Sequence, residues 1–247
     1  MMGEAQPLQS LDFADARGAG RIVFNPSLAR HPKPAWFDAS HWGEAAKPVT
    51  SGGRGAAWFV EGPFGRAVLR QYLRGGQMAR ISRDAYFWSG EAGVRSHNEL
   101  ALLALMRSLQ LPVPEPVASI HWRKGMVYRA AILVGTIPHT RTFASVLEHG
   151  PRAERLWSRI GILIARFHQA RIHHADLNAH NVLVDGEGLC HLIDFDKSER
   201  RLKGDNDWQA ENMARFARSV QKVCGEDVAL AAAVNDAVQG AYREASR

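Results

Sequence analysis

Hydrophobic and polar residues follow two different patterns along this chain, and the change from one to the other predicts the fold. Up to about residue 134, short apolar runs bounded by Gly and Pro predict strands, notably residues 57–60, 67–72 and 126–134. Beyond that point the apolar residues recur every three or four positions, as they do in amphipathic helices. A strand-rich part followed by a helix-rich part predicts an α+β protein with two unequal lobes.

Four stretches show the helical spacing clearly. One lies in the first part of the chain, directly before LPVPEPV, a proline-broken connector at residues 111–117. The predicted helices are residues 95–109, 153–171, 213–223 and 227–245. The first fifty residues show no sustained periodicity. We therefore expect an N-terminal arm (1–50) with at most one short helix, a small antiparallel-sheet lobe (51–134) and a helical lobe (135–247).

Composition places the chain among ordinary globular proteins. Of its 247 residues, 46% are hydrophobic and 23% are charged, which argues against wholesale disorder and fibrous repeats. Every apolar run falls short of the roughly 18 residues that suggest a membrane-spanning helix. The polar N-terminus lacks the features of a secretion signal, and two cysteines without CxxC spacing fit a reducing compartment. We expect the protein to stay in the cytoplasm.

The formal net charge of +6 indicates an anionic partner, which composition alone does not choose among nucleic acid, a phosphate-bearing metabolite and a membrane surface. Nucleic acid is disfavoured because no nucleic-acid-binding motif is recognisable. Two basic clusters have the composition of either a binding surface or an ordinary solvated face. They are Arg66, Arg70, Arg74, Arg80 and Arg83, and then Lys197, Arg200, Arg201 and Lys203.

The segment HHADLNAHNVLVD carries the strongest chemical signal. His174, Asp176 and Asn181 have the spacing H-x-D-L-x-x-x-N, and Asp194 follows in the strand-like CHLIDFD. Phosphoryl transfer needs a carboxylate that orients the acceptor hydroxyl and oxygen ligands that hold Mg²⁺ against the nucleotide phosphates. We assign the first role to Asp176 and the second to Asn181 and Asp194. Two short strands joined at Asp185-Gly186 would fold Asp194 back beside Asn181.

The histidines of the same region allow a competing interpretation, a zinc site. His168, His173, His174, His180 and His191 lie close together in sequence. However, no pair has the H-x-x-x-H spacing with a catalytic Glu between, and no cysteine is placed to complete a site. We therefore expect His174 to be a packing and hydrogen-bonding residue that holds the loop ahead of Asp176.

The first half of the chain supplies the expected nucleotide-binding residues. Gly52, Gly53 and Gly55 would let backbone N–H groups approach phosphates. The strand AVLRQY has the pattern of the kinase V-A-I-K strand, with Arg70 where Lys would stand, and Glu99 is the candidate helix partner of that cation. An exposed strand Arg and a helix-surface Glu are the alternatives for these two residues.

The segments GGRGAAWFV, AVLRQYLRGG, RSHNELALL, LPVPEPVA, HADLNAHNVL and LIDFDKSERR, in this order, resemble the 3-deoxy-D-manno-octulosonic acid (Kdo) kinases of the lipopolysaccharide-kinase group. The resemblance runs from about Ser27 to Val223 and implies a protein-kinase-like two-lobed fold. It also implies an enzyme that moves the γ-phosphate of ATP, with Mg²⁺, to the 4-hydroxyl of Kdo on a lipid A precursor. Such enzymes are peripheral proteins at the cytoplasmic face of the bacterial inner membrane.

Two departures from protein kinases disfavour a protein substrate: Asn178 replaces the loop Lys, and Asp196 replaces the Gly of D-F-G. The alternatives are a kinase for heptose or an aminoglycoside, and a non-catalytic pseudokinase or lipid-binding module. The intact Asp176, Asn181 and Asp194 disfavour the non-catalytic class, and nothing in the sequence indicates an obligate protein partner. As a further hypothesis, anionic lipid or lipid A phosphates contact some of Arg74, Arg80, Arg83, Arg200 and Arg201.

Overall fold

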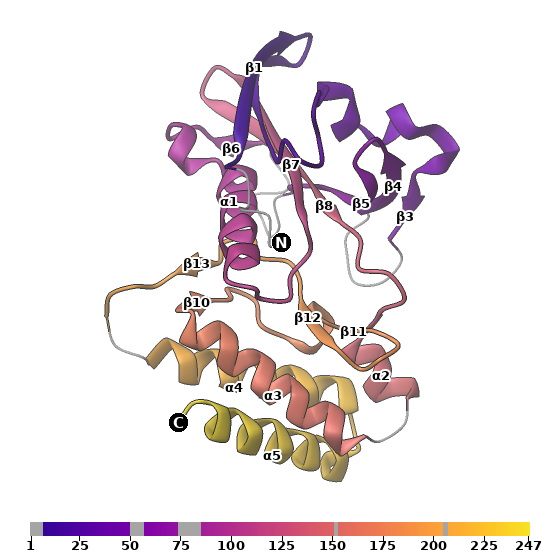
Figure 1. The fold of residues 1–247 in the computed structure, drawn as a ribbon, viewed down its shortest axis with the longest axis vertical. Helices are drawn as coiled ribbons and strands as arrows, with labels where there is room; N and C mark the ends of the chain where they lie inside the picture. The colour runs from indigo at the N-terminus through magenta and orange to yellow at the C-terminus, as the bar shows by residue number, and fades with distance from the viewer. Residues whose placement is uncertain (1–6, 50–56, 74–84, 151–152, 205–206) are drawn as a thin grey trace. The chain divides into compact units, whose positions relative to one another are not determined.

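The computed structural model describes residues 7–49, 57–73, 85–150, 153–204 and 207–247 (Figure 1). The chain divides into two compact units. Unit 1 comprises residues 1–108 and 115–136, and unit 2 comprises residues 109–114 and 137–247. Unit 1 holds the larger sheet and unit 2 holds four of the five α-helices of the described residues. This composition confirms the predicted α+β class.

Unit 1 is built on an eight-stranded antiparallel sheet with the order β1-β2-β7-β8-β5-β4-β3, in which β6 also pairs with β8. Among the described residues of unit 1, the α-helix α1 (Arg95–Ser108) packs on β7 through buried apolar side chains that include Leu103 and Met106. The strands are β1 (Gln9–Asp15), β2 (Gly18–Phe24), β3 (Lys47–Pro48), β4 (Ala57–Gly62), β5 (Gly65–Gln71), β6 (Tyr86–Phe87), β7 (Pro116–Lys124) and β8 (Val127–Gly135).

The predicted hairpin of unit 1 is confirmed, since β4 and β5 pair around the turn at Gly62–Gly65. The strand predicted at residues 126–134 corresponds to β8. The sequence did not predict β7, which begins inside the expected connector at Pro116. Proline is tolerated as the first residue of a strand because its missing N–H interrupts the ladder least there.

Residues 9–24 form strands where the sequence predicted an extended arm. β1 pairs with β2, and β2 pairs with β7 from Ala19 to Phe24. Nearly every residue of β1 is exposed, so its sequence has no apolar alternation to signal a strand. The 3₁₀ helices η1 (Pro34–Phe37) and η2 (Ala39–Ala45) follow, and Trp36 and Phe37 enter the core beneath the sheet.

Unit 2 consists of helices and two small antiparallel sheets. Figure 1 shows α3, α4 and α5 side by side, and α3 packs closely on α5. The helices are α2 (Phe143–His149), α3 (Glu154–Gln169), the 3₁₀ helix η5 (Ala179–Asn181), α4 (Asp207–Cys224) and α5 (Val228–Ala245). The strands are β9 (Arg141–Thr142), β10 (Ile172–His173), β11 (Val182–Val184), β12 (Cys190–Leu192) and β13 (Glu199–Arg200). No helix in the described residues has the length and hydropathy needed to span a membrane.

Candidate active site

The loop between β10 and η5 begins at His174, whose imidazole fixes the backbone around it. His174 is 2% exposed. Its Nε2 donates a hydrogen bond to the carbonyl of Ile193 at 3.0 Å, and its Nδ1 accepts from the N–H of Asp176 at 3.2 Å. Burial lowers the pKa of His174, which keeps the ring neutral and suits one donor and one acceptor nitrogen. The predicted loop-holding role of His174 is confirmed.

Asn178 and Asn181 close the loop around the backbone of Asp176. Both asparagine side chains donate to the carbonyl of Asp176 at 2.9 Å. The Oδ1 of Asn178 also accepts from the N–H groups of His180 and Asn181, so it caps η5. Asn178, which stands where protein kinases have a Lys, therefore helps to hold the loop in shape. The Asp176 carboxylate projects from this framework and is exposed.

The structure brings Asp194 next to Asn181, as the predicted hairpin requires. β11 pairs with β12, with Val182 opposite Leu192, and the N–H of Ile193 donates to the carbonyl of Asn181 at 3.0 Å. Asp194 has a φ of 63°, a left-handed conformation that Asp adopts more readily than most residues. Asn181 and Asp194 carry the amide and carboxylate oxygens of the kind that Mg²⁺ prefers, so these two residues could hold the ion.

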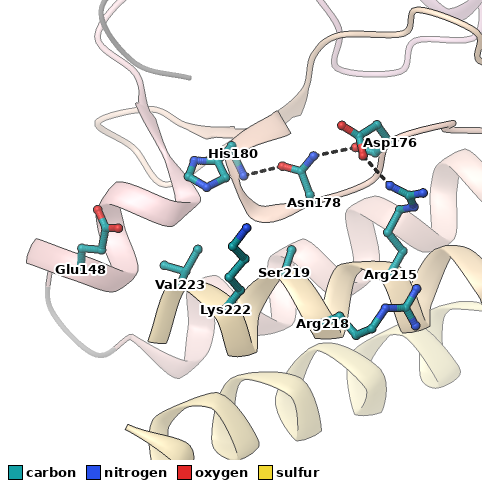
Figure 2. A pocket seen from close by; sticks show the side chains of 9 residues that line it. All are labelled: Glu148, Asp176, Asn178, His180, Arg215, Arg218, Ser219, Lys222 and Val223. Atoms are coloured by element: carbon teal, nitrogen blue, oxygen red, sulfur yellow. Dashed lines mark hydrogen bonds and ion pairs between the residues drawn. The ribbon is translucent and has the colours of Figure 1, made fainter. Parts of the chain in front are cut away.

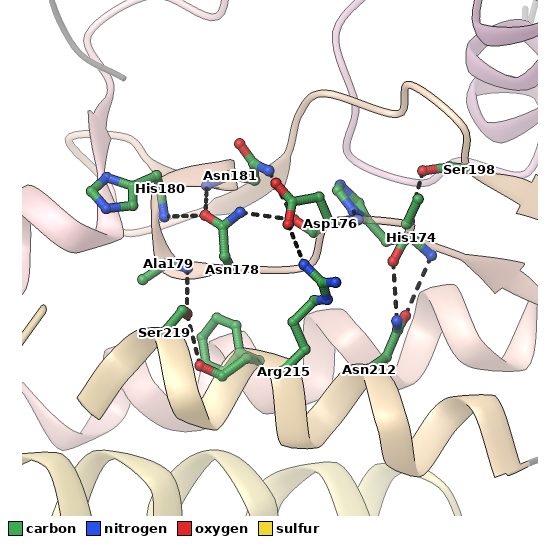
Figure 3. A network of polar contacts seen from close by, with 12 residues as sticks. His174, Asp176, Asn178, Ala179, His180, Asn181, Ser198, Asn212, Arg215 and Ser219 are labelled. Carbon is green, nitrogen blue, oxygen red and sulfur yellow. Dashed lines mark hydrogen bonds and ion pairs between the residues drawn. The ribbon is translucent and has the colours of Figure 1, made fainter. Parts of the chain in front are cut away.

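Helix α4 supports the loop through three side chains that the sequence analysis did not identify. Asn212 accepts from the N–H of His174 and donates to its carbonyl, at 3.3 and 3.0 Å (Figure 3). Ser219 Oγ accepts from the N–H of Ala179 at 2.9 Å. Arg215 Nη1 lies 2.6 Å from Asp176 Oδ1. Of these three residues, only Asn212 could have been noticed in the sequence. It is a polar residue on the same helical face as the apolar Trp208, Met213 and Phe216, which suggests a buried side chain with a specific partner.

A pocket of about 640 Å³ opens beside Asp176. One side of it is the loop, the other is α4, and Glu148 of α2 lies at one end (Figure 2). Its lining residues are Asp176, Asn178 and His180 from the loop region, Arg215, Arg218, Ser219, Lys222 and Val223 from α4, and Glu148. The pocket thus has the predicted catalytic carboxylate at its edge and three cationic side chains on one helix.

Unit 1 contains the predicted pair of Arg70 and Glu99. Arg70 Nη2 on β5 lies 2.5 Å from both carboxylate oxygens of Glu99 on α1. Tyr72 donates a further hydrogen bond to the same carboxylate. Glu99 is 4% exposed, so its charge is buried and depends on these donors. The ion pair with Glu99 holds the Arg70 guanidinium in position. The other predicted nucleotide-binding residues, Gly52, Gly53 and Gly55, lie outside the described residues.

Two of the histidines considered for a zinc site have other hydrogen-bond partners. His168 Nδ1 lies 2.8 Å from the hydroxyl of Tyr242, and His174 bonds the loop backbone. Within the described ranges, no group of three or more His, Cys, Asp or Glu residues is arranged to hold a metal ion.

Comparison with known proteins gives a consistent result. The sequence profile of the lipopolysaccharide kinase (Kdo/WaaP) family matches residues 39–239. A protein of Stenotrophomonas maltophilia (strain K279a) named 3-deoxy-D-manno-octulosonic acid kinase is 46% identical over 213 residues, which cover 86% of this chain and 84% of the relative. A protein of the same name from Xanthomonas oryzae pv. oryzae (strain PXO99A) is 45% identical over 222 residues, covering 87% and 88%.

Proposed function

Because the chain belongs to the lipopolysaccharide kinase (Kdo/WaaP) family, we propose that this kinase transfers the γ-phosphate of ATP to the 4-hydroxyl of a Kdo sugar on a lipid A precursor. Family membership makes the chain a phosphotransferase with a protein-kinase-like two-lobed fold. The observation that carries the proposal is the loop geometry. The exposed Asp176 carboxylate projects from a loop whose backbone Asn181 holds, and Ile193, directly before Asp194, bonds to the carbonyl of Asn181.

Asp176 orients the acceptor hydroxyl and takes its proton. The hydroxyl oxygen bonds to the γ-phosphorus while the bond from that phosphorus to the bridging oxygen breaks, and ADP leaves. Arg215 holds Asp176 at 2.6 Å, and the two asparagine amides hold the backbone behind it. These contacts fix the carboxylate before the substrate arrives, and such positioning supplies much of the rate in phosphoryl transfer.

Asn181 and Asp194 would hold Mg²⁺, and the ion would neutralise charge on the phosphates when bound. Arg70 takes the phosphate-contacting role that Lys has in protein kinases, braced by Glu99 and Tyr72. Arg presents a planar fork of donors in place of a point charge, so its contacts with phosphate differ from those of Lys. Gly52, Gly53 and Gly55 belong to the same proposal on sequence grounds.

The Kdo acceptor is supported by the named relatives, which share 45–46% of their residues with this chain over more than four fifths of each sequence. The decisive experiment is incubation of the purified protein with ATP, Mg²⁺ and a Kdo-bearing lipid A precursor, followed by mass spectrometry. One added phosphate on the sugar is expected, with the 4-position assigned by NMR. Phosphorylation of a heptose-bearing acceptor in preference to the Kdo acceptor would replace the proposal.

Asp176→Ala tests the mechanism in the same assay. Loss of the general base is expected to lower kcat by roughly 10²–10⁴-fold. The melting temperature and ATP affinity of the variant should remain close to those of the wild type, because the Asp176 side chain is exposed and its loop is held by backbone contacts. A folded, ATP-binding Asp176→Ala enzyme with the wild-type rate would exclude this role.

The proposal includes the place of the reaction, the cytoplasmic face of the bacterial inner membrane, where the protein would bind peripherally. Arg74, Arg80 and Arg83 lie outside the described residues, and Arg201 pairs with Glu199 at 2.8 Å. The described residues offer another surface of suitable chemistry at the turn between β7 and β8. We call it the β7–β8 tip. It consists of the exposed apolar Phe87, Met126 and Val127 with the cationic Arg123 and Lys124.

A further inference from the structure

The pocket beside Asp176 points to a role for α4 in choosing the acceptor. We propose that Lys222 and Arg218 bind the carboxylate of the acceptor sugar, so that the enzyme favours an acidic sugar over a neutral one. This inference rests on the proposed function, because it takes a sugar acid to be the acceptor held at Asp176.

The first step is the placement of the cations along α4. Arg215, Arg218 and Lys222 are separated by three and four positions, so they share one face of the helix. All three line the pocket. Figure 2 shows Arg215 reaching the Asp176 carboxylate and Lys222 extending from α4 toward the loop near His180. An anion that enters beside Asp176 therefore meets the cationic face of α4.

The second step is the rigidity of the pocket between loop and helix. Ser219 lies on the same face of α4 and accepts from the N–H of Ala179 at 2.9 Å. It also donates to the carbonyl of Phe216 at 2.7 Å. Asn212 bonds the backbone of His174 at the other end of the loop, and Arg215 pairs with Asp176 between them, so three side chains of α4 join the helix to the loop. The segment of α4 that carries the cations thus keeps a fixed position relative to the loop of Asp176.

The third step is the net charge of the residues that line the pocket. Arg215 is engaged by Asp176 at 2.6 Å. Arg218 and Lys222 have no hydrogen-bond or ion-pair partner within the part of the chain that the structure describes. The remaining carboxylate of the pocket is Glu148, on α2. Arg218 and Lys222 carry two positive charges and Glu148 carries one negative charge, so the pocket lining can accept one more negative charge, on its α4 side.

The fourth step is the chemistry of the ligand. A sugar acid carries its carboxylate on the ring that also bears the reacting hydroxyl, so an anion reaches the pocket whenever that hydroxyl reaches Asp176. A carboxylate is a suitable acceptor for the N–H groups of Arg and Lys, and a charge-assisted hydrogen bond of this kind changes affinity by roughly tenfold or more. With a neutral sugar in the same position, Arg218 and Lys222 have no anionic partner on the ligand and remain hydrated.

The experiment crosses enzyme variants with acceptor variants. Lys222→Met and Arg218→Gln remove one charge each, and Arg155→Gln, at an exposed position of α3 outside the pocket lining, is the matched control. Each enzyme is assayed with the natural acceptor, with an acceptor whose Kdo carboxylate is a carboxamide, and with one whose lipid phosphates have been removed. Melting temperatures verify that all variants fold.

The expected result is a rise in KM of about tenfold for each pocket variant on the natural acceptor, with kcat nearly unchanged. The wild-type enzyme should show a similar rise in KM on the carboxamide acceptor. On that acceptor the variants should have nearly the same KM as the wild type. The phosphate-free acceptor should retain the full effect of the variants. Arg155→Gln should behave as wild type on all three acceptors.

Two results would overturn the inference while leaving the proposed function intact. One is an equal effect of the pocket variants on the natural acceptor and the carboxamide. The other is an effect that disappears only when the lipid phosphates are removed, which would assign the pocket to a lipid phosphate. A wild-type enzyme that phosphorylates none of the acceptors would instead overturn the proposed function, and the inference with it.

Discussion

His168 is a single residue whose burial makes stability depend on pH. It lies on α3, is 3% exposed, and its Nδ1 is 2.8 Å from the Tyr242 hydroxyl. Burial lowers its pKa from 6.5 to about 4. Between pH 4 and 6.5, His168 is protonated in the unfolded chain and neutral in the folded chain. The free energy of unfolding therefore has its full value above pH 6.5 and falls as the pH decreases toward 4. The loss amounts to about 1.4 kcal/mol per pH unit.

We predict that His168→Gln removes this part of the pH dependence, because glutamine keeps a polar side chain and does not titrate. For wild type, His168 alone should lower the free energy of unfolding by about 2 kcal/mol between pH 7 and pH 5. His97, whose pKa burial lowers to about 3, adds to the total in both proteins. Urea denaturation at the two pH values measures the difference. An identical pH dependence in wild type and His168→Gln would contradict the prediction.

Single residues also show how much of the site the sequence could predict. His174, Asp176, Asn181 and Asp194 share a short stretch, and their spacing alone placed them on one loop and hairpin. Arg215 contacts Asp176 across 39 positions of sequence, and no motif joins the two. Such a contact follows from how α4 packs on the loop, which periodicity predicts only as far as the existence of the helix.

At the scale of elements, α3 and α5 approach so closely that one glycine decides their packing. A Cβ atom at Gly161 of α3 would lie 2.2 Å from the carbonyl oxygen of Val238 and 2.9 Å from the N–H nitrogen of Tyr242, both in the backbone of α5. Alanine normally stabilises a helix by up to about 1 kcal/mol relative to glycine. Here the two helices must move apart, which costs roughly 1–3 kcal/mol or more.

We therefore predict that Gly161→Ala lowers the melting temperature, although alanine is the better helix former. Gly240→Ala in α5 is the matched control, because a Cβ there would meet no atom within 4 Å. It should raise stability by about 0.5–1 kcal/mol. Calorimetry of the two variants tests both statements. Stabilisation of similar size by both substitutions would show that α3 and α5 are not in the close contact described.

The elements differ in how well the sequence predicted them, for a physical reason. α3 buries one face, so its apolar periodicity was visible in the sequence. The β4–β5 hairpin was visible as two short apolar runs around a Gly/Pro turn. β1 is exposed along nearly its whole length, and its place in the sheet comes from pairing with β2. Backbone pairing of this kind leaves no pattern in the side chains, so residues 9–24 were predicted as part of an arm.

At the scale of the whole molecule, the question is how a protein without a membrane-spanning helix in its described residues would reach a lipid acceptor. The β7–β8 tip combines two contributions that act together at an anionic membrane. Phe87 and Met126 are 66% and 76% exposed and can enter the headgroup region. Each Lys or Arg near the surface adds attraction worth about 1 kcal/mol. We expect this tip to provide much of the membrane affinity.

We predict that the wild-type protein sediments with anionic vesicles and that added salt weakens the binding, because salt screens the contribution of Arg123 and Lys124. Phe87→Ser combined with Met126→Ser should reduce binding, and Lys124→Glu should reduce it further at low salt only. Val228→Ser is the control, since Val228 is 65% exposed on α5 in unit 2. If the protein bound neutral and anionic vesicles equally, or if the control variant lost as much binding as the tip variants, membrane docking through the β7–β8 tip would be excluded.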